Sequence, residues 1–262
     1  MSEPTTSEEL VVDTEPAPIQ QQRTAAWRWL VVPILVMLIL FAVWCYLAFA
    51  DLDRTSASNL STNALLTRTW QHLWLTAICT VAVLAIAIPL GILVTRKATR
   101  VAAPIVVGLA NIGAAAPSIG LLVLFAMWLG IGVPAALVGL TVYAVLPVLR
   151  NTITGLQGID PRVVEAGRGM GMSALQVLVR IELPLAVPVI LAGVRTALVL
   201  LVGTAALAGL INAGGLGYFI DAGIALNRQP ILIVGAALIA ALALMIDWLG
   251  QVVEDVARPK GV

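Results

Sequence analysis

The stretch EAGRGMGMSALQVLVRIELP, residues 165–184, interrupts an otherwise apolar chain. It holds three glycines, two arginines and two glutamates, whereas hydrophobic residues make up 60% of the 262 residues and charged residues only 11%. Soluble domains carry about 25% charged residues, and the mean hydropathy here is +1.02. The chain is therefore predicted to be an integral membrane protein, with this stretch outside the bilayer.

Apolar runs on either side of that stretch are long enough to cross a bilayer, which takes about 20 residues. Six spans are predicted: 30–50, 72–95, 101 to about 128, about 134 to 150, 183–210 and 231–252. The sequence LGIGVP, residues 129–134, divides the third span from the fourth. The expected fold class is an all-α, polytopic transmembrane helix bundle.

Basic residues are distributed unevenly between the two sides of this bundle. With the N-terminus inside, the inner segments hold 11 of the 15 Lys and Arg residues. Because basic residues near span ends stay mostly in the cytoplasm, both termini are expected on the cytoplasmic side of the cell membrane. The rule also places a long loop, residues 151–182, in the cytoplasm.

Composition suggests the remaining boundaries. The expected organisation is a disordered cytoplasmic tail at 1–26, a first span and outer loop at 27–71, a membrane core at 72–252 and a cytoplasmic tail at 253–262. The acidic, proline-containing start of the first tail is typical of disordered segments.

Local signals predict two short helices in the cytoplasmic loop. Asp160 and Pro161 suit a helix start, the glycines at 169–171 permit a tight turn, and Ser173 with Gln176 forms a capping-box pattern. An apolar side is available from Val163, Val164, Leu175, Val177, Leu178 and Ile181. Such a helix-turn-helix can rest on lipid headgroups or dock a cytoplasmic partner, and composition does not separate these alternatives.

The spacing of the loop resembles a family motif. The motif, the EAA loop of bacterial ABC-importer permeases, is Glu-Ala-Ala, three residues, Gly, nine residues, Ile, one residue and Leu-Pro. The matching positions here are Glu165, Ala166, Gly167, Gly171, Ile181, Leu183 and Pro184, and they depart from the motif only at Gly167. The resemblance implies that these residues couple the spans to an ATPase subunit.

The resemblance extends over roughly residues 70–252. The segments RGMGMS and AGGLG, together with ELPLAVPVILAGVRTA, are similar to permeases of glycine betaine, carnitine and choline uptake systems. It implies a type I, methionine-permease-like core and alternating access. The implied partners are a pair of ABC ATPase subunits, a second permease copy or paralogue, and an extracytoplasmic solute-binding protein.

Other functional classes lack their signals in this sequence. No G-x-x-x-x-G-K-[ST] phosphate loop occurs, so ATP is expected to bind the partner subunit and no cofactor is expected in this chain. Metal-ligand spacings and catalytic constellations are also lacking, so neither a metal site nor an enzyme is predicted. The net charge of +1 gives no attraction to nucleic acid.

Polar residues inside the predicted spans are candidates for the transport pathway. Arg195 lies about 18 Å beyond Leu183 along a helix, and its role is left open between a gate and a structural charge neutralised by carbonyls or loosely by Asp247. Pro117 is expected to interrupt the third span. The pathway or gate candidates are Asn111, Pro117, Ser118 and Arg195.

The glycine-rich break before the sixth span is expected to form the outer mouth, against the binding protein. Its candidate residues are Asn212, Gly214, Gly215 and Gly217, although a simple turn is the alternative. His72 stands between Trp70 and Trp74, where an interfacial aromatic belt is the expected role.

Three rival functions remain open from sequence. The first is an ABC permease for another small solute, such as an amino acid. The second is an ion-coupled carrier or channel, which normally displays carboxylates or a selectivity ring within the membrane. A membrane-embedded enzyme is the third, disfavoured for want of a catalytic constellation.

Overall fold

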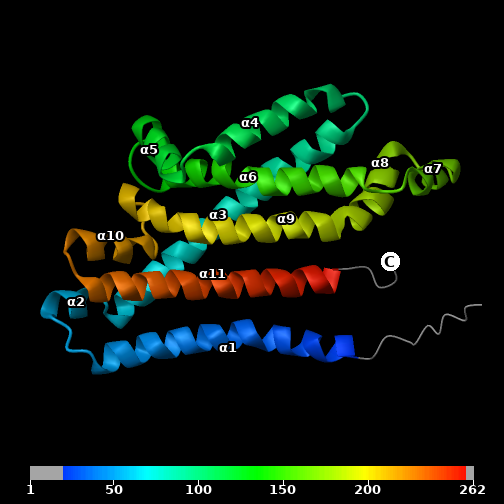
Figure 1. Ribbon diagram of the computed structural model, residues 1–262. Coiled ribbons are helices and arrows are strands. Elements are labelled where there is room, and N and C mark those ends of the chain that lie inside the picture. Colours follow the sequence, from blue (N-terminus) through cyan, green and yellow to red (C-terminus); the bar gives the residue numbers. More distant parts are fainter. Residues whose placement is uncertain (1–19, 258–262) are drawn as a thin grey trace, which may run out of the picture.

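The computed structural model describes residues 20–257, and within that range every regular element is a helix (Figure 1). In chain order these are α1 (Gln20–Phe49), α2 (Arg54–Asn59), α3 (Thr62–Thr95), η1 (Arg100–Ala102), α4 (Ala103–Ala115), α5 (Ser118–Leu129), α6 (Val133–Gln157), α7 (Pro161–Gly169), α8 (Ala174–Val177), the π-helical turn η2 (Leu178–Glu182), α9 (Leu183–Thr204), the 3₁₀-helix η3 (Ala205–Ile211), α10 (Gly217–Ala225) and α11 (Gln229–Ala257). The all-α prediction is confirmed.

Most of the predicted spans correspond to long helices. Five segments of the described range are long and apolar enough to cross a membrane: Trp29–Phe49, Thr62–Thr95, Val133–Gln157, Ala174–Ile211 and Gln229–Ala257. The second begins at Thr62 rather than at His72, so much of the predicted outer loop is helical. Residues 20–26 and 253–257, predicted as tails, also belong to helices; 1–19 and 258–262 lie outside the described residues.

The predicted third span is broken rather than continuous. Its two halves, α4 and α5, meet at an angle of 99°. Ala116, between them, is extended, as residues before a proline usually are, and Pro117 has no N–H to continue the ladder of α4. The sequence predicted a disturbance at Pro117 but not a turn of this size.

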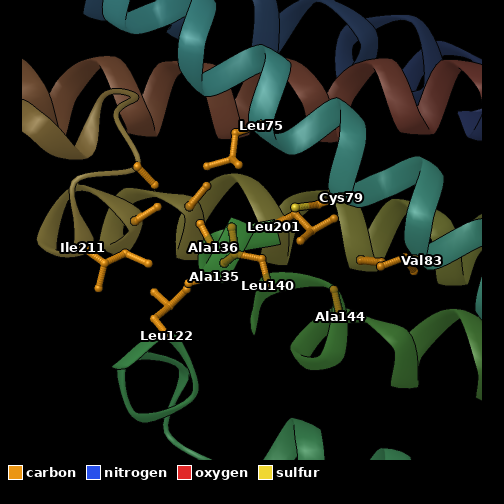
Figure 2. Close-up of a cluster of buried hydrophobic side chains, with 14 of the residues drawn as sticks. Leu75, Cys79, Val83, Leu122, Ala135, Ala136, Leu140, Ala144, Leu201 and Ile211 are labelled. Carbon is orange, nitrogen blue, oxygen red and sulfur yellow. The ribbon is translucent and has the colours of Figure 1, made fainter. Parts of the chain in front are cut away.

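Helix α6 lies at the centre of the bundle and packs against α3, α4, α5 and α9. Figure 2 shows the main buried cluster, where Cys79 and Val83 of α3 lie near Leu140 and Ala144 of α6 and near Leu201 of α9. Small residues let the helix backbones approach closely. A β-carbon added at Gly193 of α9, for example, would lie 2.6 Å from the β-carbon of Asn151 in α6.

Helix α1 lies at the edge of the bundle. It packs chiefly against α11 (Figure 1), and only 6% of its most apolar window is buried. The indole N–H of Trp248 donates a hydrogen bond of 2.9 Å to the carbonyl of Trp29. Its other sides carry exposed apolar residues such as Phe41 and Trp44, as expected for a surface that faces lipid.

The two ends of the bundle are built differently (Figure 1). The start of α1, the end of α11 and both α7 and α8 lie at one end, which we call the loop end. Helices α2 and α10 lie at the opposite end, which we call the mouth end. Because the start of α1 and the end of α11 lie at the same end, the chain crosses the bundle an even number of times. The five long segments therefore require α4 and α5 together as a sixth crossing.

We predict that Gly193→Ala destabilises the protein by about 1–3 kcal/mol, because the added methyl group overpacks the contact between α9 and α6. The measurement is the melting temperature of the purified protein in detergent. Gly203→Ala, in the same helix, is the matched control, since its added methyl group meets no atom within 4 Å. Equal melting temperatures for the two variants would contradict this packing.

Candidate functional site

The loop between α6 and α9 folds by the local rules expected from its sequence. The carboxylate of Asp160 accepts a 2.9 Å hydrogen bond from the N–H of Arg162 and caps α7. Gly171 has φ of +83°, the left-handed conformation that ends the turn after α7. Ser173 and Gln176 exchange two hydrogen bonds, of 2.8 and 3.3 Å, in a complete capping box. The predicted helix starts and the turn at 169–171 are therefore confirmed.

The sequence predicted a short second helix ahead of the fifth span, but in the structure the two are continuous. Helix α8 continues through the π turn η2 into α9, so one helical segment runs from Ala174 to Ile211. Pro184 has no N–H to give to the carbonyl four residues before it, and a wider turn just before a proline accommodates that missing bond. Helix α8 is therefore continuous with the membrane-spanning helix.

Gly167, at the position of the motif's second alanine, packs against the end of the Ile181 side chain. A β-carbon at this position would lie 2.5 Å from Cδ1 of Ile181, so the end of that side chain would have to shift to admit an alanine. Val177 is 1% exposed and lies on the same internal side. The structure thus brings together the two ends of the motif, with Leu183 and Pro184 at the start of α9.

Two of the other predicted apolar residues of the loop, Val163 and Leu175, lie at the surface instead. Leu175 is 69% exposed and Val163 is 42% exposed, and Met170 beside them is 74% exposed. Glu165 and Ala166 are also exposed. We call the surface formed by Val163, Met170 and Leu175 the exposed loop face.

Sequence reasoning missed a buried glutamate inside the motif. Glu182, between Ile181 and Leu183, is 7% exposed. Its Oε2 lies 2.7 Å from Nη2 of Arg96, the residue that follows α3. The two residues are far apart in sequence, so no local pattern predicts the pair; the only signal was a charged residue in an apolar run.

The pathway candidates fall into two separate places. Nη2 of Arg150 in α6 donates a 2.6 Å hydrogen bond to Oδ1 of Asn111 in α4. Pro117 and Ser118 lie at the bend, as the cap and first residue of α5. Arg195 is not with them, because it projects from α9 toward α11.

Arg195 has a direct partner rather than a loose one. Its Nε and Nη2 donate hydrogen bonds of 2.7 and 3.0 Å to the two carboxylate oxygens of Asp247. Oε2 of Glu254 lies 3.7 Å from Nη1, and the aliphatic part of Arg195 crosses Gly250. Asp247 and Glu254 are seven residues apart, a helical spacing that places both on one face and that the sequence analysis did not use.

The predicted mouth residues form a compact loop anchored to α3. Asn212 ends η3 in the left-handed conformation with φ of 55°, and Gly214 and Gly215 also have positive φ. Gly217 permits the closest backbone approach, since a β-carbon there would lie 1.8 Å from the carbonyl oxygen of Ala206. These four residues lie between the end of η3 and the start of α10, the helix at the mouth end (Figure 1).

The sequence suggested that His72 lies at the membrane interface, but the residue is fully buried, at 0% exposure. Its Nδ1 accepts a 3.3 Å hydrogen bond from the N–H of Leu216, and its Nε2 lies 3.0 Å from the carbonyl oxygen of Val202. Beside it, Oε1 of Gln71 accepts from the N–H of Gly215 at 3.2 Å. Its partners are distant in sequence, so flanking tryptophans gave a misleading signal.

A second set of contacts joins helices at the surface of the mouth end. The hydroxyl of Tyr218 donates a 2.9 Å hydrogen bond to Oδ1 of Asn59 in α2. The guanidinium of Arg68 lies 3.9 Å from the centre of the Tyr218 ring and donates to Gln71. Helices α2, α3 and α10 are thereby joined.

Comparison with protein families decides the general assignment. Residues 87–258 match the model of the binding-protein-dependent transport system inner membrane component. This chain belongs to that family. The match covers the segment from the last third of α3 to the end of α11 and leaves α1 outside it. The permease resemblance drawn from the loop is confirmed.

Individual relatives agree with the family. The chain is 40% identical over 205 residues to the glycine betaine/carnitine/choline transport system permease protein of Bacillus subtilis, covering 78% of this chain and 94% of the relative. It is 42% identical over 199 residues to the osmoprotectant import permease protein of Salmonella typhimurium, covering 74% and 92%. An inward-facing structure of the MetNI methionine ABC transporter is 27% identical, with a TM-score of 0.66, covering 76% of this chain and 100% of that one.

We predict that Asp247→Asn destabilises this family member by on the order of 2 kcal/mol, because it leaves the charge of Arg195 partly buried with weaker compensation. Thermal unfolding of the purified protein in detergent is the measurement. The control is Arg228→Gln, which removes an ion pair with Asp53 whose side chains are 46% and 41% exposed and should cost little. A larger loss for the control than for Asp247→Asn would refute this ranking.

Proposed function

We propose that this chain is the membrane-spanning permease subunit of an ATP-driven importer for small quaternary ammonium osmoprotectants of the glycine betaine, choline and carnitine class. The folded coupling motif carries the proposal, because a capped turn with an exposed apolar face is continuous with a spanning helix. The names of the relatives support the substrate class. The similarity to a methionine transporter keeps an amino acid as the second candidate.

The exposed loop face is the surface that an ATPase subunit would cover. Leu175 and Met170 are largely exposed at the loop end, and the adjacent helix α7 carries exposed residues of both charges, Arg162, Glu165 and Arg168. Apolar contacts ringed by charged residues are typical of protein interfaces. ATP would bind the partner, and this chain would contribute no catalytic residue. Nucleotide-driven movement of α8 would pass into α9 through their continuous backbone.

The transport pathway would follow the broken helix α4 and α5. Arg150 of α6 is exposed, and its hydrogen bond to Asn111 connects α6 to the first half of this broken helix. Ile105, Leu109 and Ile112 of α4 are exposed and share one helix face, which a second permease copy would cover. A bent helix that exposes backbone groups is tolerated where it lines a cavity. Two permeases would thus enclose the pathway between them.

Arg195 would stabilise the packing of α9 against α11 rather than act as a gate. It is paired with Asp247 and Glu254, so the site carries no excess positive charge that would repel a cationic substrate. The same pairing disfavours an ion-coupled carrier, in which a carboxylate must be free to bind the coupling ion. Asp247 is instead held by two hydrogen bonds to Arg195.

The loop end would face the cytoplasm and the mouth end would meet the solute-binding protein. Both described ends of the chain lie at the loop end (Figure 1), in keeping with cytoplasmic N- and C-terminal segments. Basic residues at the loop end, including Arg96, Arg162 and Arg180, agree with the positive-inside rule.

Changing Leu175 to Glu should abolish transport while leaving the permease folded. The residue is 69% exposed, so the substitution costs little stability in the free subunit but places a charge in the ATPase contact. We expect radiolabelled glycine betaine uptake into proteoliposomes, with the partner ATPase and binding protein present, to fall at least about tenfold. Val256→Glu is the control, since that residue is 82% exposed at the end of α11, outside the loop.

Unchanged uptake by the Leu175→Glu variant would overturn the coupling assignment. Competition by unlabelled choline, carnitine and methionine in the same assay separates the two substrate candidates. Competition by methionine alone would replace the quaternary amine with an amino acid. Uptake that continues without the ATPase would support the ion-coupled carrier instead.

A further inference from the structure

Helix α3 is attached at its loop end to the coupling motif. Arg96 directly follows the helix, and its guanidinium lies 2.7 Å from the carboxylate of Glu182. Its Nε also donates a 3.2 Å hydrogen bond to the carbonyl of Ile92, which fixes the arginine to the last turn of α3. Glu182 is 7% exposed, and a carboxylate so buried is stable only with a charged partner. Displacement of the η2 turn must therefore move Arg96 or break this pair.

The same helix is attached at the mouth end to a different part of the chain. His72 is bonded through both ring nitrogens, to Leu216 of the mouth loop and to Val202 of α9. Because Nδ1 accepts the amide hydrogen of Leu216, Nε2 carries the ring proton and donates it to the carbonyl of Val202. The imidazole thus connects α3, the end of α9 and the mouth loop, and Gln71 adds a bond to Gly215.

The helix between these attachments has little room to bend. Its buried residues form a continuous face against α6 and α9: Leu75, Thr76, Cys79, Val83, Ala87, Gly91 and Val94. Pro89 removes one internal hydrogen bond, but Gly91 just beyond it lies against Thr152, where an added β-carbon would come within 2.6 Å. The two attached ends are about 36 Å apart along the helix.

We propose that α3 mechanically links the coupling loop to the mouth loop, with Arg96 and His72 as the positioning residues at its two ends. Movement of η2 would shift α3 through the ion pair of Glu182, and α3 would shift the segment 213–216 through His72 and Gln71. The link rests on the proposed function only for the source of the movement, the ATPase. Helix α9 supplies a parallel route, and the two routes converge at Val202.

The test measures a change at the mouth loop after a change at the loop end, in the permease alone. In a background without native cysteines (Cys45→Ser, Cys79→Ala), Ala213→Cys reports on the mouth loop, since Ala213 is 9% exposed. The readout is the rate of maleimide labelling in lipid nanodiscs. We expect Glu182→Gln, Arg96→Gln and His72→Leu each to raise this rate about threefold to tenfold, the effect of losing an ion pair at the loop end or two hydrogen bonds at the mouth end.

Control variants separate a link from general loosening. Arg100→Gln changes an exposed arginine at the same end and should leave the rate unchanged. His72→Gln keeps one donor and one acceptor and should restore much of the wild-type rate, and Arg96→Glu combined with Glu182→Arg should do the same at the other end. Ala144→Cys, in the 0% exposed core of α6, is a second reporter that should remain unlabelled in every variant.

Combining variants tests whether the two ends act on one route. Glu182→Gln added to His72→Leu should raise the rate by a smaller factor than Glu182→Gln does alone, because His72 no longer passes a change at the loop end to the mouth loop. The proposal is overturned if the loop-end variants leave Ala213→Cys unchanged, or if Ala144→Cys becomes labelled equally. Since no ATPase or substrate is present, neither result depends on glycine betaine uptake, which tests the proposed function separately.

Discussion

The helices of this protein are constrained above all by the absence of hydrogen-bond partners in lipid. Every backbone N–H and C=O at membrane depth needs a partner within the protein, so interruptions are permitted only against other protein segments. The end of α9 shows the rule at work. Where the α-helix changes to the 3₁₀-helix η3, the carbonyl of Val202 is met by the ring of His72. The break at Ala116 and Pro117 is covered partly by α6, against which both α4 and α5 pack.

This constraint explains why small residues matter more here than large ones. Helices whose backbone hydrogen bonds are all internal can still be stabilised by van der Waals contact with one another. That contact is closest at glycine, which has no side chain to separate the backbones. Gly193, Gly91 and Gly217 each lie where an added β-carbon would overlap a neighbouring atom. Two of these contacts hold α6 to its neighbours, and the third seats α10 on η3. The result is a core whose helices cannot separate slightly without losing their contacts.

Local chemistry made the coupling loop predictable, whereas contacts distant in sequence did not. Asp160, Gly171 and Ser173 act on residues within one turn of themselves, so their roles could be inferred from spacing. The continuity of α8 with α9 depends on a π turn that no residue pattern announces. His72 has partners 130 and 144 residues away, and the sequence analysis left Glu182 without a role. The 99° bend at Pro117 likewise depends on how α5 packs, not on the proline alone.

The position of α1 has a consequence for the order in which the protein is made. Among the described helices, α1 is synthesised before the others, but its main packing partner, α11, is synthesised after them. During that interval most of the surface of α1 is in contact with the bilayer rather than with other helices. It has the highest mean hydropathy of the five candidate spans, 2.8, and almost no buried face. Its composition therefore suits a helix that is stable in lipid by itself and that packs against α11 only after the rest of the bundle has formed.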